Sequence, residues 1–201
     1  MYHSTVRFCT QTSIAMSSID KNQQERNRQD LYGNYSIKKI AELAEEQTCF
    51  FCTSNGSTGA ARPMSVLKVD DDGNLWFLSA NDSSQNKEIE QNNAVNLYFQ
   101  GSSHSNFMHL SGKASITDDK DLIKEFWNPF FKTWFTEGEN DPRISVIKFT
   151  TEDGYYWDTK HGNFISGIKI LIGAATGHTM DDSIQGVLKT ELPHRNHVAH
   201  G

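Results

Sequence analysis

The sequence predicts a mainly β protein, an antiparallel barrel of six or seven short strands with a few flanking helices. Short apolar segments recur along the chain and are separated by turn residues such as Asp, Asn and Gly. Only a few segments have helical periodicity, too few to supply a crossover helix for each strand. An antiparallel barrel therefore fits the pattern better than a doubly wound parallel sheet does.

The 201 residues suit one domain of ordinary size, and their apolar content of 36% is typical of a globular protein. The net charge of −6 argues against a nucleic-acid-binding protein with a broad basic face. No segment is long and apolar enough for a transmembrane helix, so no membrane partner is expected. We expect the domain to occupy residues 31–176, between a disordered tail over residues 1–30 and a loosely held tail over residues 177–201.

Three cysteines, Cys9, Cys49 and Cys52, cannot form a fully paired disulfide framework. Cys49 and Cys52 have the spacing of a redox motif but lie in a predicted strand, where residues three apart point to opposite faces. We therefore expect buried structural thiols, which fit a reducing compartment such as the cytoplasm. No metal site is expected.

The first elements follow from caps and periodicity. Ser36 is expected to cap a helix whose apolar residues form one stripe: Ile37, Ile40, Ala41, Leu43 and Ala44. Residues 48–54 form a buried strand, and the turn over residues 55–59 makes it a hairpin with the strand that begins near Arg62. Pro63 cannot donate to a sheet, which places it on an edge or near a strand start.

The next stretch is the one around which the chain is organised. Residues 62–68 read as a strand, residues 70–73 as an Asp-rich turn that ends in Gly73, and residues 75–79 as a short buried strand. Ser83 or Ser84 then caps a helix, which leaves free N–H groups at its start. Such a helix start, with Arg62 reaching over from the neighbouring strand, suits a phosphate monoester. An ordinary hairpin and helix with a solvated Arg62 fits the spacing equally well.

The second half continues the sheet. Residues 94–99 and 108–117 are predicted strands, with a bulge at Gly112, and residues 118–127 are a predicted helix. A last hairpin is expected between residues 144–151 and 155–158, across a turn at residues 152–154. A short apolar helix is expected over residues 164–174.

Four segments in this order resemble the pyridoxamine 5′-phosphate oxidase-like split barrels that bind FMN, and within them the general stress protein branch. These segments are Arg62-Pro-Met64, the strand over residues 75–79, Asp82-Ser83 running into Glu88-Ile89, and Gly154-Tyr-Tyr-Trp-Asp158. The resemblance covers roughly residues 36–175. It implies a split barrel and a homodimer with two FMN sites at the interface, each built from both chains.

The resemblance also assigns residues to the flavin phosphate. Arg62 matches the phosphate arginine of the family, and Ser79 and Ser83 match hydroxyl positions around the same phosphate. Gln85 stands where the family usually has a basic residue. Gln85 can donate a hydrogen bond but brings no charge, and Lys87, half a helical turn further on, is expected to compensate.

For the flavin ring, the resemblance implies that the backbone at Met64 and Ser65 lies along the ring. Trp157 would reach the ring from the partner chain. An apolar wall with a few backbone or hydroxyl contacts is what a flavin needs, because the redox chemistry belongs to the cofactor. No catalytic residue of the chain is predicted.

Three classes of function follow. The first is an FMN-dependent oxidoreductase that passes electrons between a reduced nicotinamide nucleotide, or another small substrate, and an acceptor. The second is a non-catalytic flavin-binding or stress-linked sensor or storage protein. The third is a barrel without a cofactor, which acts only through partners.

Overall fold

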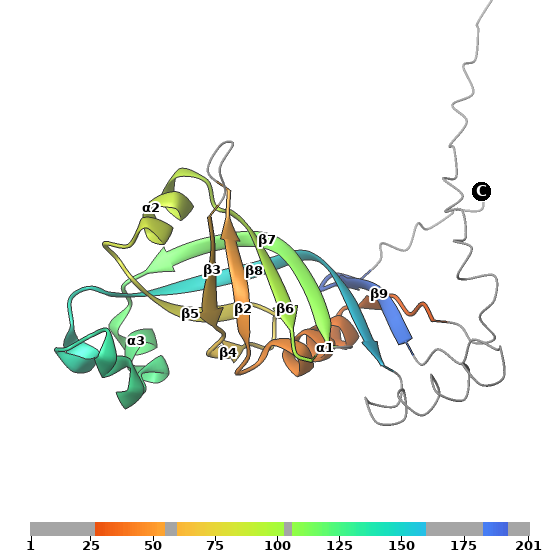
Figure 1. Cartoon of the computed structure of the whole chain (residues 1–201), viewed down its shortest axis with the longest axis horizontal. Helices are drawn as coiled ribbons and strands as arrows, with labels where there is room; N and C mark the ends of the chain where they lie inside the picture. Colours follow the sequence, from red (N-terminus) through yellow and green to blue (C-terminus); the bar gives the residue numbers. More distant parts are fainter. Residues whose placement is uncertain (1–26, 55–59, 103–105, 160–182, 193–201) are drawn as a thin grey trace, which may run out of the picture.

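The computed structural model describes residues 27–54, 60–102, 106–159 and 183–192, and it confirms the mainly β class. Within these residues, nine strands make one open sheet in the order β1-β9-β8-β7-β6-β2-β3, and β5 pairs with both β4 and β8 (Figure 1). Every strand pairing is antiparallel except that of β1 with β9. The strand number exceeds the expected six or seven, because β1, β4 and β9 join the predicted set.

The elements have the following bounds. The strands are β1 (Leu31–Tyr32), β2 (Thr48–Thr53), β3 (Ala60–Ser65), β4 (Lys68–Val69), β5 (Leu75–Ala80), β6 (Ala94–Gln100), β7 (Phe107–Thr117), β8 (Ile144–Thr159) and β9 (Ser183–Lys189). The helices are α1 (Asn34–Ala44), α2 (Ser84–Gln91) and α3 (Lys120–Phe126), with 3-10 turns η2 (Pro129–Thr133) and η3 (Gly138–Asn140). Helices α2 and α3 lie at the end of the molecule away from β9 (Figure 1).

The long strand β8 decides how the sheet curves. It pairs with β7 along most of its length, while its first half also pairs with β5 and its second half with β9. The hairpin expected across residues 152–154 is therefore wrong, since these residues continue one strand of 16 residues. The strand is closely packed at Gly154, where a Cβ would lie 2.6 Å from Leu110 Cδ2 and 3.1 Å from the carbonyl oxygen of His109.

The bulge expected near Gly112 is confirmed. The register between β7 and β8 shifts between Ser111 and Gly112, and the residue without a partner is Glu152 on β8. A Cβ on Gly112 would lie 2.0 Å from the carbonyl oxygen of Thr150. Glycine thus allows the close backbone approach that the irregular pairing requires.

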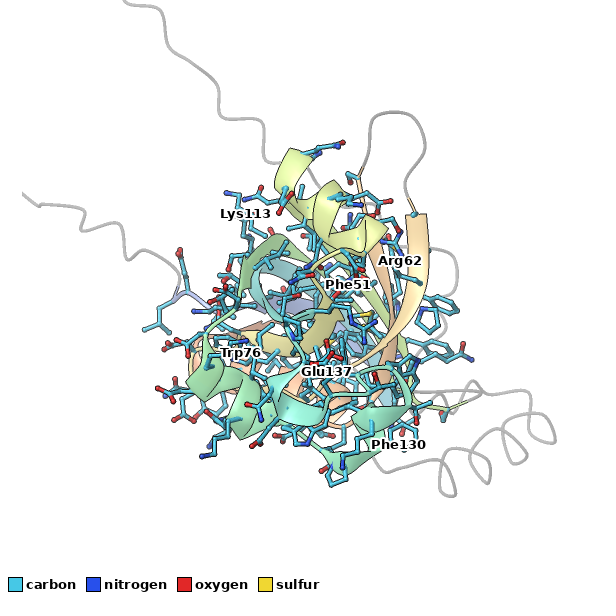
Figure 2. The ribbon with its side chains drawn as sticks, turned by 90° about the vertical axis from the view of Figure 1, so that its left-hand side faces the viewer. Phe51, Arg62, Trp76, Lys113, Phe130 and Glu137 are labelled. Carbon is cyan, nitrogen blue, oxygen red and sulfur yellow. The ribbon has the colours of Figure 1, made fainter. Side chains whose placement is uncertain are left out.

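Two apolar clusters stabilise the barrel. The larger one fills its interior and includes Phe51 (Figure 2), whose ring meets that of Phe77 edge to face at 5.3 Å. The smaller one joins α3 and η2 to β5 and the start of β8. Phe130 lies at the periphery, outside this cluster, and is 68% exposed to solvent (Figure 2). Cys49 is buried and Cys52 half-buried on opposite faces of β2, as predicted, and burial raises the pKa of Cys49 to about 12.

Helix α1 has the predicted apolar stripe but not the predicted cap. Ile40, Leu43 and Ala44 are buried, as expected. The helix begins at Asn34 after Gly33, which has a φ of 53° and serves as N-cap without a side-chain hydrogen bond. Ser36 is therefore an interior, buried helical residue, and its expected capping role is wrong.

Parts of both expected tails belong to the sheet. Residues 183–189 of the expected C-terminal tail form β9, which pairs with β8 and β1. Gln29, from the expected N-terminal tail, donates its N–H to the carbonyl oxygen of Gln185 at 2.8 Å. The sheet thus includes residues on both sides of the expected domain, because β9, in a largely polar stretch, pairs on both of its edges. The helix expected over residues 164–174 lies outside the described residues.

Candidate functional site

Helix α2 begins where the sequence predicts. Ser83 is its N-cap with extended backbone, and its Oγ accepts a hydrogen bond from Asn86 N at 3.2 Å. The other N–H groups of the first turn have no partner within the helix, and they carry the positive end of its dipole. This end of α2 is therefore suited to an anion.

A buried polar network anchors that helix end to the sheet. Ser79 on β5 donates to Asn86 Oδ1 at 2.9 Å, and Asn86 Nδ2 donates to Ser145 Oγ on β8 at 2.8 Å. Ser145 in turn donates to the carbonyl oxygen of Ser79 at 3.1 Å. The hydroxyls of Ser79 and Ser83 lie 3.4 Å apart, so the structure brings these two predicted residues together. Because the hydroxyl proton of Ser79 is committed to Asn86, Ser83 is the freer donor.

Gln85 lies in the first turn of α2 and is buried. Its side chain is only 4% exposed, and its buried Nε2 has no hydrogen-bond partner among the described residues. A buried amide without a hydrogen-bond partner costs free energy, and a ligand atom that accepted its hydrogen bond would remove that cost. Lys87 is exposed. Residues two apart on a helix do not share a face, so Gln85 and Lys87 are not interchangeable there.

Arg62 reaches α2 from the edge strand β3. Its Nη1 and Nη2 donate to the two carboxylate oxygens of Glu88 at 2.8 and 3.2 Å. The Thr53 hydroxyl donates to the same carboxylate. Arg62 stands opposite the fully buried Phe51, so its side chain lies on the inner face of the sheet (Figure 2). Glu88 lies about 7.5 Å along the axis of α2 from its N-cap, given the rise of roughly 1.5 Å per residue.

Met64 and Ser65 complete the predicted part of β3. In the described part of the chain β3 pairs with β2 alone, so one row of its backbone N–H and C=O groups has no strand partner. Met64 stands opposite the buried Cys49 and packs on the core, whereas Ser65 is exposed. This free edge can offer the backbone contacts that were expected at these two residues.

Trp157 lies elsewhere. It is on the outer face of β8, four strand spacings from β3, which is about 19 Å across the sheet. Arg62 and Trp157 of one chain therefore lie on opposite faces of the sheet, and the structure does not bring them together.

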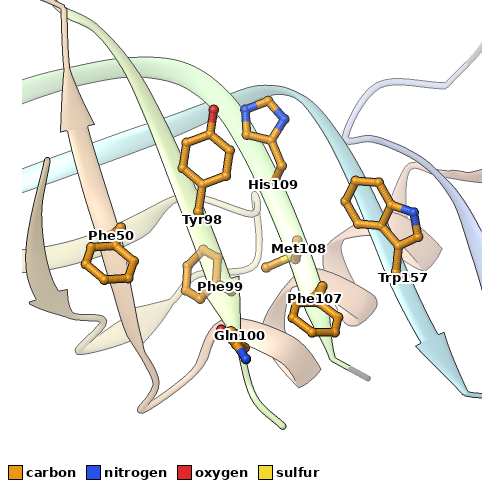
Figure 3. Close-up of a pocket in the computed structure, with 8 residues that line it drawn as sticks. All are labelled: Phe50, Tyr98, Phe99, Gln100, Phe107, Met108, His109 and Trp157. Carbon is orange, nitrogen blue, oxygen red and sulfur yellow. The ribbon is translucent and has the colours of Figure 1, made fainter. Parts of the chain in front are cut away.

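Trp157 belongs to an aromatic face that the sequence analysis did not identify. Phe50, Tyr98 and His109 stand opposite one another across β2, β6 and β7, and Trp157 on β8 lies on the same face, two residues along the strand from the partner of His109 (Figure 3). They line a pocket of about 350 Å³. Phe50, Tyr98 and Trp157 are 60%, 48% and 44% exposed, and the rings of Tyr98 and His109 stack at 4.7 Å. Alternation with the buried Phe51, Leu97 and Phe99 was the sequence signal that could have revealed this face.

The sequence matches the family described as pyridoxamine 5′-phosphate oxidase like over residues 35–181, which is most of the chain. The chain belongs to this family. Protein bli-3 of Neurospora crassa is 28% identical over 134 residues, which cover 59% of this chain and 64% of that protein. The chain thus spans slightly less than two-thirds of the length of that relative.

Solved structures support the split-barrel fold of the family. A protein described as general stress protein 26, from Jannaschia sp., superposes with a TM-score of 0.64 at 22% identity, covering 77% of this chain and 96% of that chain. A general stress FMN/FAD binding protein from Xanthomonas citri superposes with a TM-score of 0.52 at 23% identity, covering 59% and 84%. Within the part of the chain that the structure describes, no helix has both the length and the apolar character needed to cross a bilayer.

Proposed function

We propose that this protein binds FMN, with the phosphate at the N-terminal end of α2. The observation that carries the proposal is the buried amide of Gln85, which lies in the first turn of α2 without a partner among the described residues. A phosphate oxygen would give this amide its acceptor. The free N–H groups of the helix start, the Ser83 hydroxyl and the Arg62 guanidinium complete the donor set. These donors fit a phosphate monoester, and the similarity to a solved structure described as an FMN/FAD binding protein supports the same ligand.

The flavin ring is placed in this proposal along the free edge of β3. The backbone of Met64 and Ser65 would hydrogen-bond to ring heteroatoms, since one row of its polar groups has no strand partner among the described residues. The partly buried side chain of Met64 offers apolar contact nearby. When bound, the flavin supplies the electron transfer, and the chain orients the ring and excludes water from it.

We further propose that two copies of the chain share each site. Trp157 cannot reach the flavin of its own chain, because it lies on the opposite face of the sheet and four strands away from β3, about 19 Å measured along the sheet. A second copy that covers the aromatic face would bury Phe50 and Tyr98 and could bring its own Trp157 to the flavin. Exposed aromatic groups of this kind are typical of protein interfaces.

The proposed activity is that of an FMN-dependent oxidoreductase, with a reduced nicotinamide nucleotide or another small molecule as electron donor. The two free thiols among the described residues fit a reducing compartment such as the cytoplasm. A non-catalytic flavin-binding protein is the second candidate. The uncharged Gln85 favours it, together with the pairing of Arg62 with Glu88, because both reduce the positive charge available to a phosphate.

The test is a visible absorption spectrum of the full-length protein as purified, followed by release of any yellow ligand and its identification by mass. We expect FMN, or uptake of added FMN by a colourless protein. A protein that stays colourless with excess FMN, FAD and riboflavin contradicts the proposal. Bleaching of the flavin by a reduced nicotinamide nucleotide, with reoxidation by an acceptor, distinguishes the oxidoreductase from the non-catalytic flavin binder.

A further inference from the structure

Arg62 is not a free cation in this structure. Its Nη1 and Nη2 face the two oxygens of Glu88 at 2.8 and 3.2 Å, so the two groups form a two-pronged ion pair. A guanidinium has five N–H donors, and these two bonds leave its Nε–H and outer N–H groups available. The side chains of Arg62 and Glu88 are 25% and 15% exposed, which limits screening by water.

The carboxylate of Glu88 is fixed and charged. The Thr53 hydroxyl donates to one of its oxygens, and Thr53 is itself buried. The hydrogen bonds from Arg62 and Thr53 lower the pKa of Glu88, so it stays ionised at neutral pH. The guanidinium and this carboxylate cancel in charge. Gln85 is neutral and Lys87 is exposed, so the end of α2 offers a phosphate many donors but little net positive charge.

We propose that Glu88 is a specificity-determining residue, which weakens the binding of phosphorylated ligands by sharing Arg62 with them. This inference rests on the FMN-binding function proposed above. A phosphate dianion that binds Arg62 must lie close to the Glu88 carboxylate, and the two negative groups repel each other in a partly desolvated site. A flavin without a phosphate does not meet this repulsion. The carboxylate thus reduces the preference of the site for FMN over riboflavin.

The test compares Glu88→Gln with the wild type. Glutamine keeps the length of the side chain and one acceptor for Arg62 but removes the charge. The flavin-free, full-length protein is titrated with FMN and with riboflavin, and quenching of flavin fluorescence gives each Kd. We expect the Kd of FMN to fall roughly five- to tenfold in E88Q, because a nearby like charge is removed, and that of riboflavin to change by less than about twofold. A purely structural role for Glu88 would change both affinities alike.

Glu90→Gln is the matched control, because Glu90 is an exposed acid on the same helix. E90Q should keep the wild-type ratio of the two affinities. If E88Q does not fold, Glu88→Asp keeps the charge but withdraws it by one methylene, and it should raise the preference for FMN by a smaller factor.

The outcomes separate the two proposals. A folded Glu88 variant whose preference for FMN over riboflavin is unchanged or reduced overturns this inference alone. A rise of the same size in E90Q also overturns it, since any charge change on α2 would then suffice. A wild-type protein that binds neither flavin overturns the proposed function and this inference together.

Discussion

Arg62 and Glu88, 26 residues apart in sequence, are joined by two hydrogen bonds of 2.8 and 3.2 Å. The contact fastens α2 to β3, which is the edge strand of the described sheet. The buried hydroxyl of Thr53 on β2 also binds the carboxylate, so three elements meet at one acid. The guanidinium that we propose as a phosphate donor is therefore held in position by these contacts.

Replacing Arg62 with alanine should weaken FMN binding by about 1.5–3 kcal/mol, the range for a hydrogen bond to a charged group. Titration of the flavin-free protein with FMN measures the loss. Arg28→Ala is the control, because Arg28 is also paired with a neighbouring acid, Asp30, but lies beside β9, at the end of the molecule away from α2. Equal affinities for FMN in R62A and the wild type would refute the phosphate assignment.

Gln85→Ala and Lys87→Ala distinguish the two side chains that are candidates to replace the basic residue usual in the family. From the sequence, Lys87 is expected to compensate. In the structure Gln85 is buried in the first turn of α2 and Lys87 is exposed, so we expect Q85A to lose more affinity for FMN than K87A. The loss in Q85A should be about 1 kcal/mol, which is typical of one hydrogen bond. A larger loss of FMN affinity in K87A than in Q85A would instead support the hypothesis that Lys87 compensates for Gln85.

Phe50→Glu should convert the proposed dimer into a monomer, because it places a charge at the most exposed ring of the aromatic face. Sedimentation velocity measures the mass in solution. Phe130→Glu makes the same change at another exposed phenylalanine, on η2, and should leave the mass unchanged. A dimeric F50E protein would show that the two copies meet at another surface. A monomeric F50E protein that keeps full FMN affinity would contradict the shared site.

Asp141 should contribute stability that depends on pH. Arg143 donates to its carboxylate at 2.7 and 3.0 Å and lowers the pKa of Asp141 to about 2, from an ordinary value of 3.8. Because the pKa is lower in the folded state, the contribution is complete above the ordinary value and is lost as the pH falls towards 2. Asp141→Asn should therefore lower the Tm at pH 7, and its difference from the wild type should shrink between pH 4 and pH 2. A difference that does not vary with pH would show that the ion pair is not the cause.

Gly112→Ala should destabilise the barrel by about 1–3 kcal/mol or more, the usual cost of overpacking. The new Cβ would lie 2.0 Å from a backbone oxygen of Thr150, which cannot turn away as a side-chain end can. Urea unfolding of the variant gives the change in the free energy of unfolding. Ser115→Ala, at an exposed position of the same strand, is the control and should change it little. An equally stable G112A protein would show that the two strands separate at the bulge without cost.

Much of the fold follows from short-range sequence patterns. Short apolar segments between turn residues predicted β2, β5, β6 and β7, Gly73 predicted the turn before β5, and Ser83 was identified as one of two capping candidates. The expected cap at Ser36 is wrong, because a serine at the start of an apolar stripe resembles a cap even when the helix already begins two residues earlier. Polar sequence likewise concealed β9, whose pairing with β8 depends on strands far away in the chain.

By itself, the sequence determined the strand-rich class, the start of α2 and the residues that gather around it, because caps, turns and alternation act over a few neighbouring positions. Only the tertiary structure decided that Glu88 pairs with Arg62 and that Trp157 lies on the opposite face of the sheet from Arg62. The order of strands in a sheet and the length of β8 set these relations. They depend on pairings between segments dozens of residues apart, which local patterns do not specify.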